Sequence, residues 1–82
     1  MAYRWEITRD HIEIDGPVTI RGPREYDRSI TDSPSSFELF DDDGVLQYSG
    51  VIFGNYTGFE PLDDFGTPNA GCTLVKLNGE SL

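Results

Sequence analysis

The chain has 82 residues, of which 37% are hydrophobic, and its length excludes a two-domain enzyme because so short a chain buries only about 60% of the surface that its unfolded form exposes. We therefore expect one domain, residues 1–82, around one thin core. The formal charge of −9, from 15 acids and 6 bases, disfavours direct binding to nucleic acid or to an anionic membrane, both of which need Lys and Arg against phosphate.

The first part of the chain predicts a β-hairpin. Large apolar side chains alternate with polar ones over residues 3–8, and after the polar residues 9–11 the alternation continues at Ile12 and Ile14, which is typical of a strand with one buried face. Residues 15–17, Asp-Gly-Pro, supply a turn before a short second strand at 18–20. Residues 24–36 are mostly polar, and we expect a surface connection there.

A second hairpin is predicted in the middle of the chain. Two β-rich runs, residues 37–40 and 45–53, flank the sequence Asp-Asp-Asp-Gly at 41–44. Gly44 can adopt the positive φ that a tight reversal needs, and Gly50 is a candidate for a β-bulge.

The last third predicts little helix. Residues 59–66 can form one helical turn with Gly66 as its stop, residues 67–71 read as a loop, and residues 72–77 read as a final strand. The predicted fold is mainly β, or α+β with one short helical turn. It is a small single antiparallel sheet of four to six short strands built from hairpins.

The aromatic residues of the strands are expected to pack in the core rather than to stack on a ligand. This applies to Trp5, Phe37, Tyr48 and Phe53. Phe40 has the opposite parity to Phe37 in its strand and is the best candidate for an exposed aromatic anchor.

The sequence predicts no cofactor, no metal centre and no enzyme. His11 and Cys72 are the only residues of their types, so a zinc site would need two carboxylates or a second chain to complete it. The acids before Gly44 fail the calcium-hand spacing, which leaves open only a weak cation site on adjacent carboxylates. His11 beside Asp10 has no evident nucleophile partner, so a catalytic role for it remains the weaker alternative.

The expected location is the cytoplasm. One cysteine cannot form an internal disulfide, and neither a signal peptide nor a membrane-spanning run is present in the sequence.

The charges are distributed unevenly along the chain. Five of the six bases fall within residues 1–28, whereas eight acids and no base lie between Asp32 and Asp64. If the hairpin turn and the following loop share one side, their carboxylates would form a continuous acidic surface. The predicted partner-binding residues are Asp41, Asp42, Asp43, Glu60, Asp63 and Asp64, with Phe40 and Tyr56 as apolar contacts. The alternative is that these charges serve only solubility.

The short acidic chain with its lone cysteine and no catalytic constellation resembles the small single-domain inhibitors of bacteriophages, above all the anti-CRISPR proteins. The segments 10–12, 41–44 and 59–66 also look like those of short bacterial and phage proteins. The resemblance implies a stoichiometric inhibitor, monomeric or dimeric, that imitates DNA on a basic subunit of a CRISPR surveillance complex in the host bacterial cell and blocks target DNA binding. The alternative is an intracellular structural or adaptor module that binds a protein through a sheet edge or an apolar patch.

Overall fold

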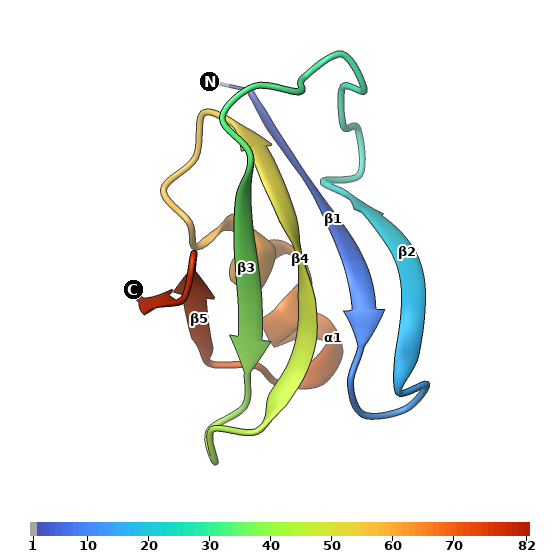
Figure 1. Cartoon of the computed structure of the whole chain (residues 1–82), viewed down its shortest axis with the longest axis vertical. Helices are drawn as coiled ribbons and strands as arrows, with labels where there is room; N and C mark the ends of the chain where they lie inside the picture. Colours follow the sequence, from blue (N-terminus) through green and yellow to red (C-terminus); the bar gives the residue numbers. More distant parts are fainter. Residues whose placement is uncertain (1) are drawn as a thin grey trace.

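One antiparallel sheet of six strands organises the computed structural model, which describes residues 2–82 (Figure 1). The order across the sheet is β2-β1-β4-β3-β5-β6. The strands are β1 (Tyr3–Asp10), β2 (Gly16–Gly22), β3 (Ser35–Phe40), β4 (Leu46–Gly54), β5 (Leu74–Leu77) and β6 (Glu80–Ser81). The predicted fold class is confirmed, and both predicted hairpins, β1–β2 and β3–β4, are present.

A short helical segment covers one face of the sheet, behind β3 and β4 in Figure 1. It consists of a π-helical turn, η1 (Leu62–Gly66), followed by α1 (Thr67–Ala70). Apolar side chains of the strands and of this segment form the core: Trp5, Ile7, Phe37, Leu39, Ile52, Leu62, Cys72 and Val75. The opposite face of the sheet carries no helix, and we call it the open face.

The helical segment is longer than the sequence predicted, and Gly66 is not its stop. Gly66 has helical dihedrals and lies against the core, where an added Cβ would sit 3.1 Å from both Cys72 and Leu39. Residues 67–71, which the sequence predicted as a loop, therefore include α1, with Pro68 in its first turn. The helix ends instead at Gly71, which adopts the left-handed conformation with φ 64°.

The predicted extension of the first strand to Ile14 was wrong. β1 ends at Asp10, and Ile12 and Ile14 are exposed in the loop that follows. The Asp10 carboxylate accepts hydrogen bonds from the backbone N–H groups of Ile12 and Glu13, at 2.9 and 3.0 Å. This local turn competes with continued strand pairing and ends the strand.

The bulge and one aromatic side chain also differ from the prediction. The register of β1 against β4 shifts between Ile7 and Arg9, so the irregularity lies in β1 rather than at Gly50. Phe53 is outside the core, on the open face, where the Arg4 guanidinium stacks 4.0 Å from its ring centre. Strand alternation explains this, because Phe53 neighbours the buried Ile52 in the chain and must point the other way.

The C-terminal hairpin was not predicted. Asn78 and Gly79, with φ of 51° and 84°, reverse the chain between β5 and β6. Positive φ at both turn positions matches the two-residue hairpin turn that Asn-Gly favours. The last residues therefore add a short strand at the edge of the sheet.

Candidate functional site

Three of the predicted partner-binding acids form the turn between β3 and β4, and we call Asp41, Asp42 and Asp43 the hairpin acids. Asp41 Oδ1 accepts the backbone N–H groups of Asp43 and Val45, each at 2.9 Å, and its Oδ2 accepts Gln47 Nε2 at 3.1 Å. Asp42 and Asp43 are exposed. Asp41 thus holds the turn, while its two neighbours face solvent.

The other three predicted acids lie where the chain enters η1, and we call Glu60, Asp63 and Asp64 the helix-side acids. Glu60 accepts the backbone N–H groups of Thr57 and Gly58, each at 2.8 Å. Burial raises the pKa of the Glu60 carboxyl, but these hydrogen bonds outweigh it and leave the pKa below its ordinary value of 4.5. Asp64 accepts hydrogen bonds from Tyr3 Oη at 2.8 Å and from Trp5 Nε1 at 3.0 Å.

The six acids are divided between two places on the molecule. Asp64 is held beside Trp5, which pairs with Ile52, whereas the hairpin acids follow Phe40, which pairs with Leu46. Ile52 and Leu46 are six residues apart in β4, so the two groups are separated by about 20 Å along the strand direction at ~3.4 Å per residue. The six acids therefore form two separate groups and not the single continuous acidic surface that the sequence predicted.

Neither group is neutralised by a nearby base. Within residues 2–82, the ion pairs involve only two acids, Glu6 and Asp15. The helix-side acids affect the pKa of Tyr3, which is raised to about 12. Burial is the largest cause and the hydrogen bond to Asp64 is the second, and the charges of Glu60 and Asp63 raise the pKa further. Both groups are therefore without a basic ion-pair partner among the described residues.

The Tyr3–Asp64 contact predicts a loss of stability at alkaline pH. The Tyr3 pKa is about 12 in the folded chain and 10.0 when unperturbed, so between these values the folded state holds a proton that the unfolded state has released. The free energy of unfolding should fall by about 1 kcal/mol as pH rises from 10 to 12, which is less than the ~2.7 kcal/mol that the two pKa values alone imply, because Tyr3 contacts solvent. Urea unfolding at pH 9, 10, 11 and 12 measures this loss for the native chain and for Tyr3→Phe, which should lack that part of the decline. Equal slopes in the two proteins would contradict the assignment.

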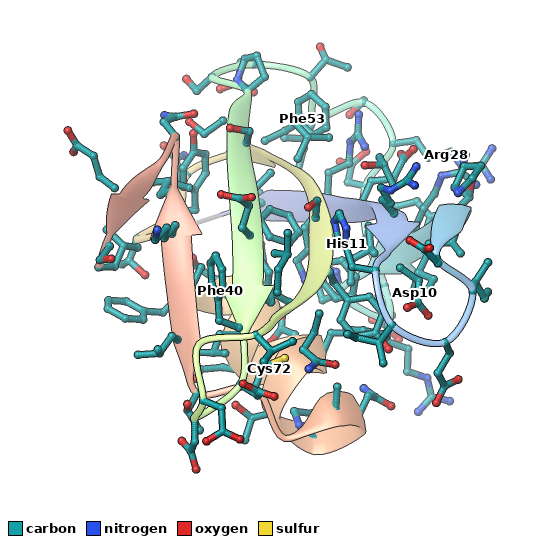
Figure 2. The ribbon with its side chains drawn as sticks, turned by 60° about the horizontal axis from the view of Figure 1, so that its bottom comes forward. Asp10, His11, Arg28, Phe40, Phe53 and Cys72 are labelled. Atoms are coloured by element: carbon teal, nitrogen blue, oxygen red, sulfur yellow. The ribbon has the colours of Figure 1, made fainter. Side chains whose placement is uncertain are left out.

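The two predicted apolar contact residues have different surroundings. Phe40 lies at the end of β3 beside β5, as Figure 2 shows, with Lys76 Nζ 5.2 Å from its ring centre. Together with Leu74 and Leu82 it lines a hollow of about 170 Å³. The Tyr56 hydroxyl is engaged within the chain, since it donates to the Ser33 carbonyl at 2.6 Å.

His11 has a partner that the sequence did not indicate. Its Nε2 lies 2.7 Å from Ser49 Oγ across the β1–β4 pair, near the end of β1 (Figure 2). A Ser–His contact is one element of nucleophilic catalysis, which also needs a third group that orients the imidazole and donors for an oxyanion. Asp10, the adjacent acid, directs its carboxylate to backbone N–H groups instead.

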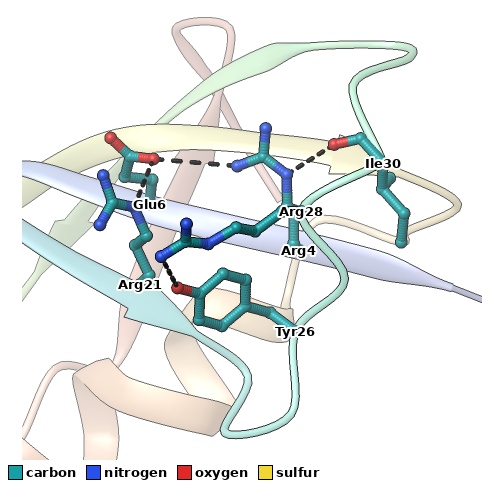
Figure 3. A network of polar contacts seen from close by, with 6 residues as sticks. All are labelled: Arg4, Glu6, Arg21, Tyr26, Arg28 and Ile30. Atoms are coloured by element: carbon teal, nitrogen blue, oxygen red, sulfur yellow. Dashed lines mark hydrogen bonds and ion pairs between the residues drawn. The ribbon is translucent and has the colours of Figure 1, made fainter.

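A group of arginines on the open face was missed by the sequence analysis. Figure 3 shows it where β1, β2 and the loop after β2 meet. A hollow of about 240 Å³ is lined by Arg4, Glu6, Arg21, Tyr26 and Arg28, and we call it the arginine hollow. Of its lining residues, only Glu6 carries a carboxylate.

Glu6 and the loop hold these arginines in place. Glu6 Oε2 lies 3.8 Å from Arg4 Nη1 and 3.3 Å from Arg21 Nε. Arg4 Nε donates to the Ile30 carbonyl at 2.5 Å, and Arg28 Nη2 donates to Tyr26 Oη at 3.5 Å. The Arg28 hydrogen bond is the first cause of a lowered Tyr26 pKa, and the positive charges of Arg28 and Arg21 add to it.

Comparisons with known proteins add no relative. No protein-family model, curated protein or solved structure matches this chain. In the part of the chain that the structure describes, no helix has the length and apolar character of a membrane span. Residues 2–82 also contain no group of three or more His, Cys, Asp or Glu side chains placed to hold a metal ion.

Proposed function

We propose that this chain is a non-enzymatic inhibitor that docks its acidic groups on a basic, nucleic-acid-binding protein surface. Following its resemblance to anti-CRISPR proteins, the partner is a subunit of a bacterial CRISPR surveillance complex, bound in the cytoplasm, and the effect is loss of target DNA binding. One observation carries the proposal: within residues 2–82, the hairpin and helix-side acids form no ion pair with a basic side chain.

The spacing of the two acidic groups supports contact at two points. Phosphates recur about every 3.4 Å along one strand of a duplex, so a separation of about 20 Å corresponds to roughly six phosphate steps. Asp41, Glu60 and Asp64 are fixed by hydrogen bonds to the chain itself. Fixed carboxylates lose little side-chain entropy on binding, which favours association with a groove of Arg and Lys.

Competition with DNA tests this function directly. The purified chain is added to a CRISPR surveillance complex, and binding of labelled target DNA is followed by fluorescence anisotropy at ~50 and ~300 mM salt. We expect the chain to displace DNA and the inhibitory concentration to rise steeply with salt, because carboxylate contacts are screened. Unchanged DNA binding across surveillance complexes of several types would contradict the proposed function.

The second candidate is an adaptor that binds a protein through the apolar hollow beside β5. Leu74 and Leu82 are 51% and 48% exposed there, next to Phe40. Association through such a surface would depend on apolar burial and would respond little to ionic strength. Salt-insensitive binding that Leu74→Ser abolishes would favour this candidate over the acidic one.

A further inference from the structure

The arginine hollow is a local exception in a strongly acidic molecule. Three guanidinium groups face one carboxylate, which leaves a surplus of positive charge in a chain whose formal charge is −9. The hollow lies on the open face, because Arg4 and Glu6 alternate in β1 with Tyr3 and Trp5, whose polar atoms bind Asp64 on the covered face. It is therefore on the other side of the sheet from the helix-side acids.

The arginines have donors to spare for a ligand. A guanidinium carries five N–H donors, and the contacts found here engage one or two on each arginine. Arg4 is the most enclosed, with its side chain 13% exposed, while the Arg21 side chain is 44% exposed and Arg28 is also exposed. Arg4 thus forms the floor, and Arg21 and Arg28 can close on an anion from the rim.

The charge and shape of the hollow select a small dianion. A phosphate monoester carries about −1.5 to −2 at pH 7 and offers three acceptor oxygens, which match the planar fork of an arginine. A long polyanion would also meet the acids elsewhere on the molecule, whereas a small ligand senses mainly the field within the Debye length of about 8–10 Å. Tyr26 adds a hydroxyl and a ring face at the rim.

We propose that the arginine hollow binds a small phosphate-bearing ligand, gripped by Arg21 and Arg28 above Arg4, with Glu6 and Tyr26 holding the guanidinium groups in position. This site is independent of the acidic groups and of the partner that they bind. The free phosphate ion and the phosphate of a nucleotide share the chemistry that the hollow recognises.

Titration followed by NMR tests the site. Inorganic phosphate and adenosine 5′-monophosphate are added separately at constant ionic strength, and the arginine Nε–Hε and backbone signals are recorded. We expect saturable shifts confined to Arg4, Arg21, Arg28 and Tyr26. Tighter binding of the nucleotide would assign the site to nucleotides, and equal binding would assign it to the free ion. Shifts that do not saturate, or that scatter over the chain, would overturn the proposal.

Two charge-matched variants complete the test. R21Q/R28Q should weaken phosphate binding by about tenfold or more, because it removes the charge-assisted donors at the rim. R9Q/R24Q removes the same amount of charge outside the hollow. Arg9 pairs with Asp15 at 4.0 Å and Arg24 is exposed in the loop after β2, so this variant should bind phosphate as the native chain does. Equal weakening in both would show a general charge effect and reject the site. The single variant R28Q, altered only in the exposed loop, gives the same comparison if R21Q/R28Q does not fold.

Discussion

Replacing Gly50 with alanine is expected to lower the free energy of unfolding by about 3 kcal/mol or more. Gly50 lies in β4, between Ile7 of β1 and Phe37 of β3. A Cβ at this position would stand 2.7 Å from the Phe37 ring and would also run into the Glu6 carbonyl oxygen. Because that oxygen belongs to the backbone of the neighbouring strand, relief requires a displacement of β1. A chain of this size has a total stability of only about 4–12 kcal/mol.

The matched control for this variant is Gly44→Ala. Gly44 has φ 77° in the β3–β4 turn, and nothing lies within 4 Å of a Cβ added there, so alanine would suffer only the backbone strain of about 1 kcal/mol. Urea unfolding followed by circular dichroism compares the midpoints of the two variants with that of the native chain. A Gly50→Ala midpoint as high as that of Gly44→Ala would show that the sheet tolerates a side chain at its centre.

Reversing the two exposed hairpin acids is expected to slow association with the proposed basic partner by about tenfold at low salt. The variant is Asp42→Lys/Asp43→Lys. Asp41 is left intact because it accepts two backbone N–H groups in the turn, and its loss would disturb the hairpin. The stability of this variant should be nearly native, because the replaced side chains are exposed and only the backbone N–H of Asp43, which lysine keeps, donates to Asp41.

The control for this reversal is Glu13→Lys/Glu25→Lys, which changes the formal charge equally at exposed positions near β2. Surface plasmon resonance on the immobilised surveillance complex, at ~50 and ~300 mM salt, measures the association rate of each protein. The hairpin variant should be slow at low salt and should converge with the native chain at high salt. Equal slowing by both double variants would mean that net charge, and no particular surface, governs association.

Much of the fold was predictable because it depends on local patterns. Alternation in residues 3–8 identified the buried face of β1, and the Asp-Gly turn before Val45 identified the central hairpin. The end of β1 was predicted wrongly, because the apolar pattern continues to Ile14 whereas the Asp10 carboxylate ends the strand. The role of Gly66 was also predicted wrongly: the glycine does not end the helix, and its small size lets the helical segment approach Cys72 and Leu39. In both cases a specific contact overrode the pattern.

The amino-acid sequence alone determined which side chains share a face and where the acids and arginines lie along the chain, because residues two apart in a strand point the same way. Only the tertiary structure decided which of them meet. It divided the six acids into two groups about 20 Å apart, since Asp64 is bonded to Trp5 at the level of Ile52, whereas the hairpin acids follow Phe40 at the level of Leu46. It also folded the loop after β2 back over β1, which brought Arg28 to Arg21 and Arg4. Contacts between residues so distant in the chain are set by strand order and loop packing, and no local pattern encodes them.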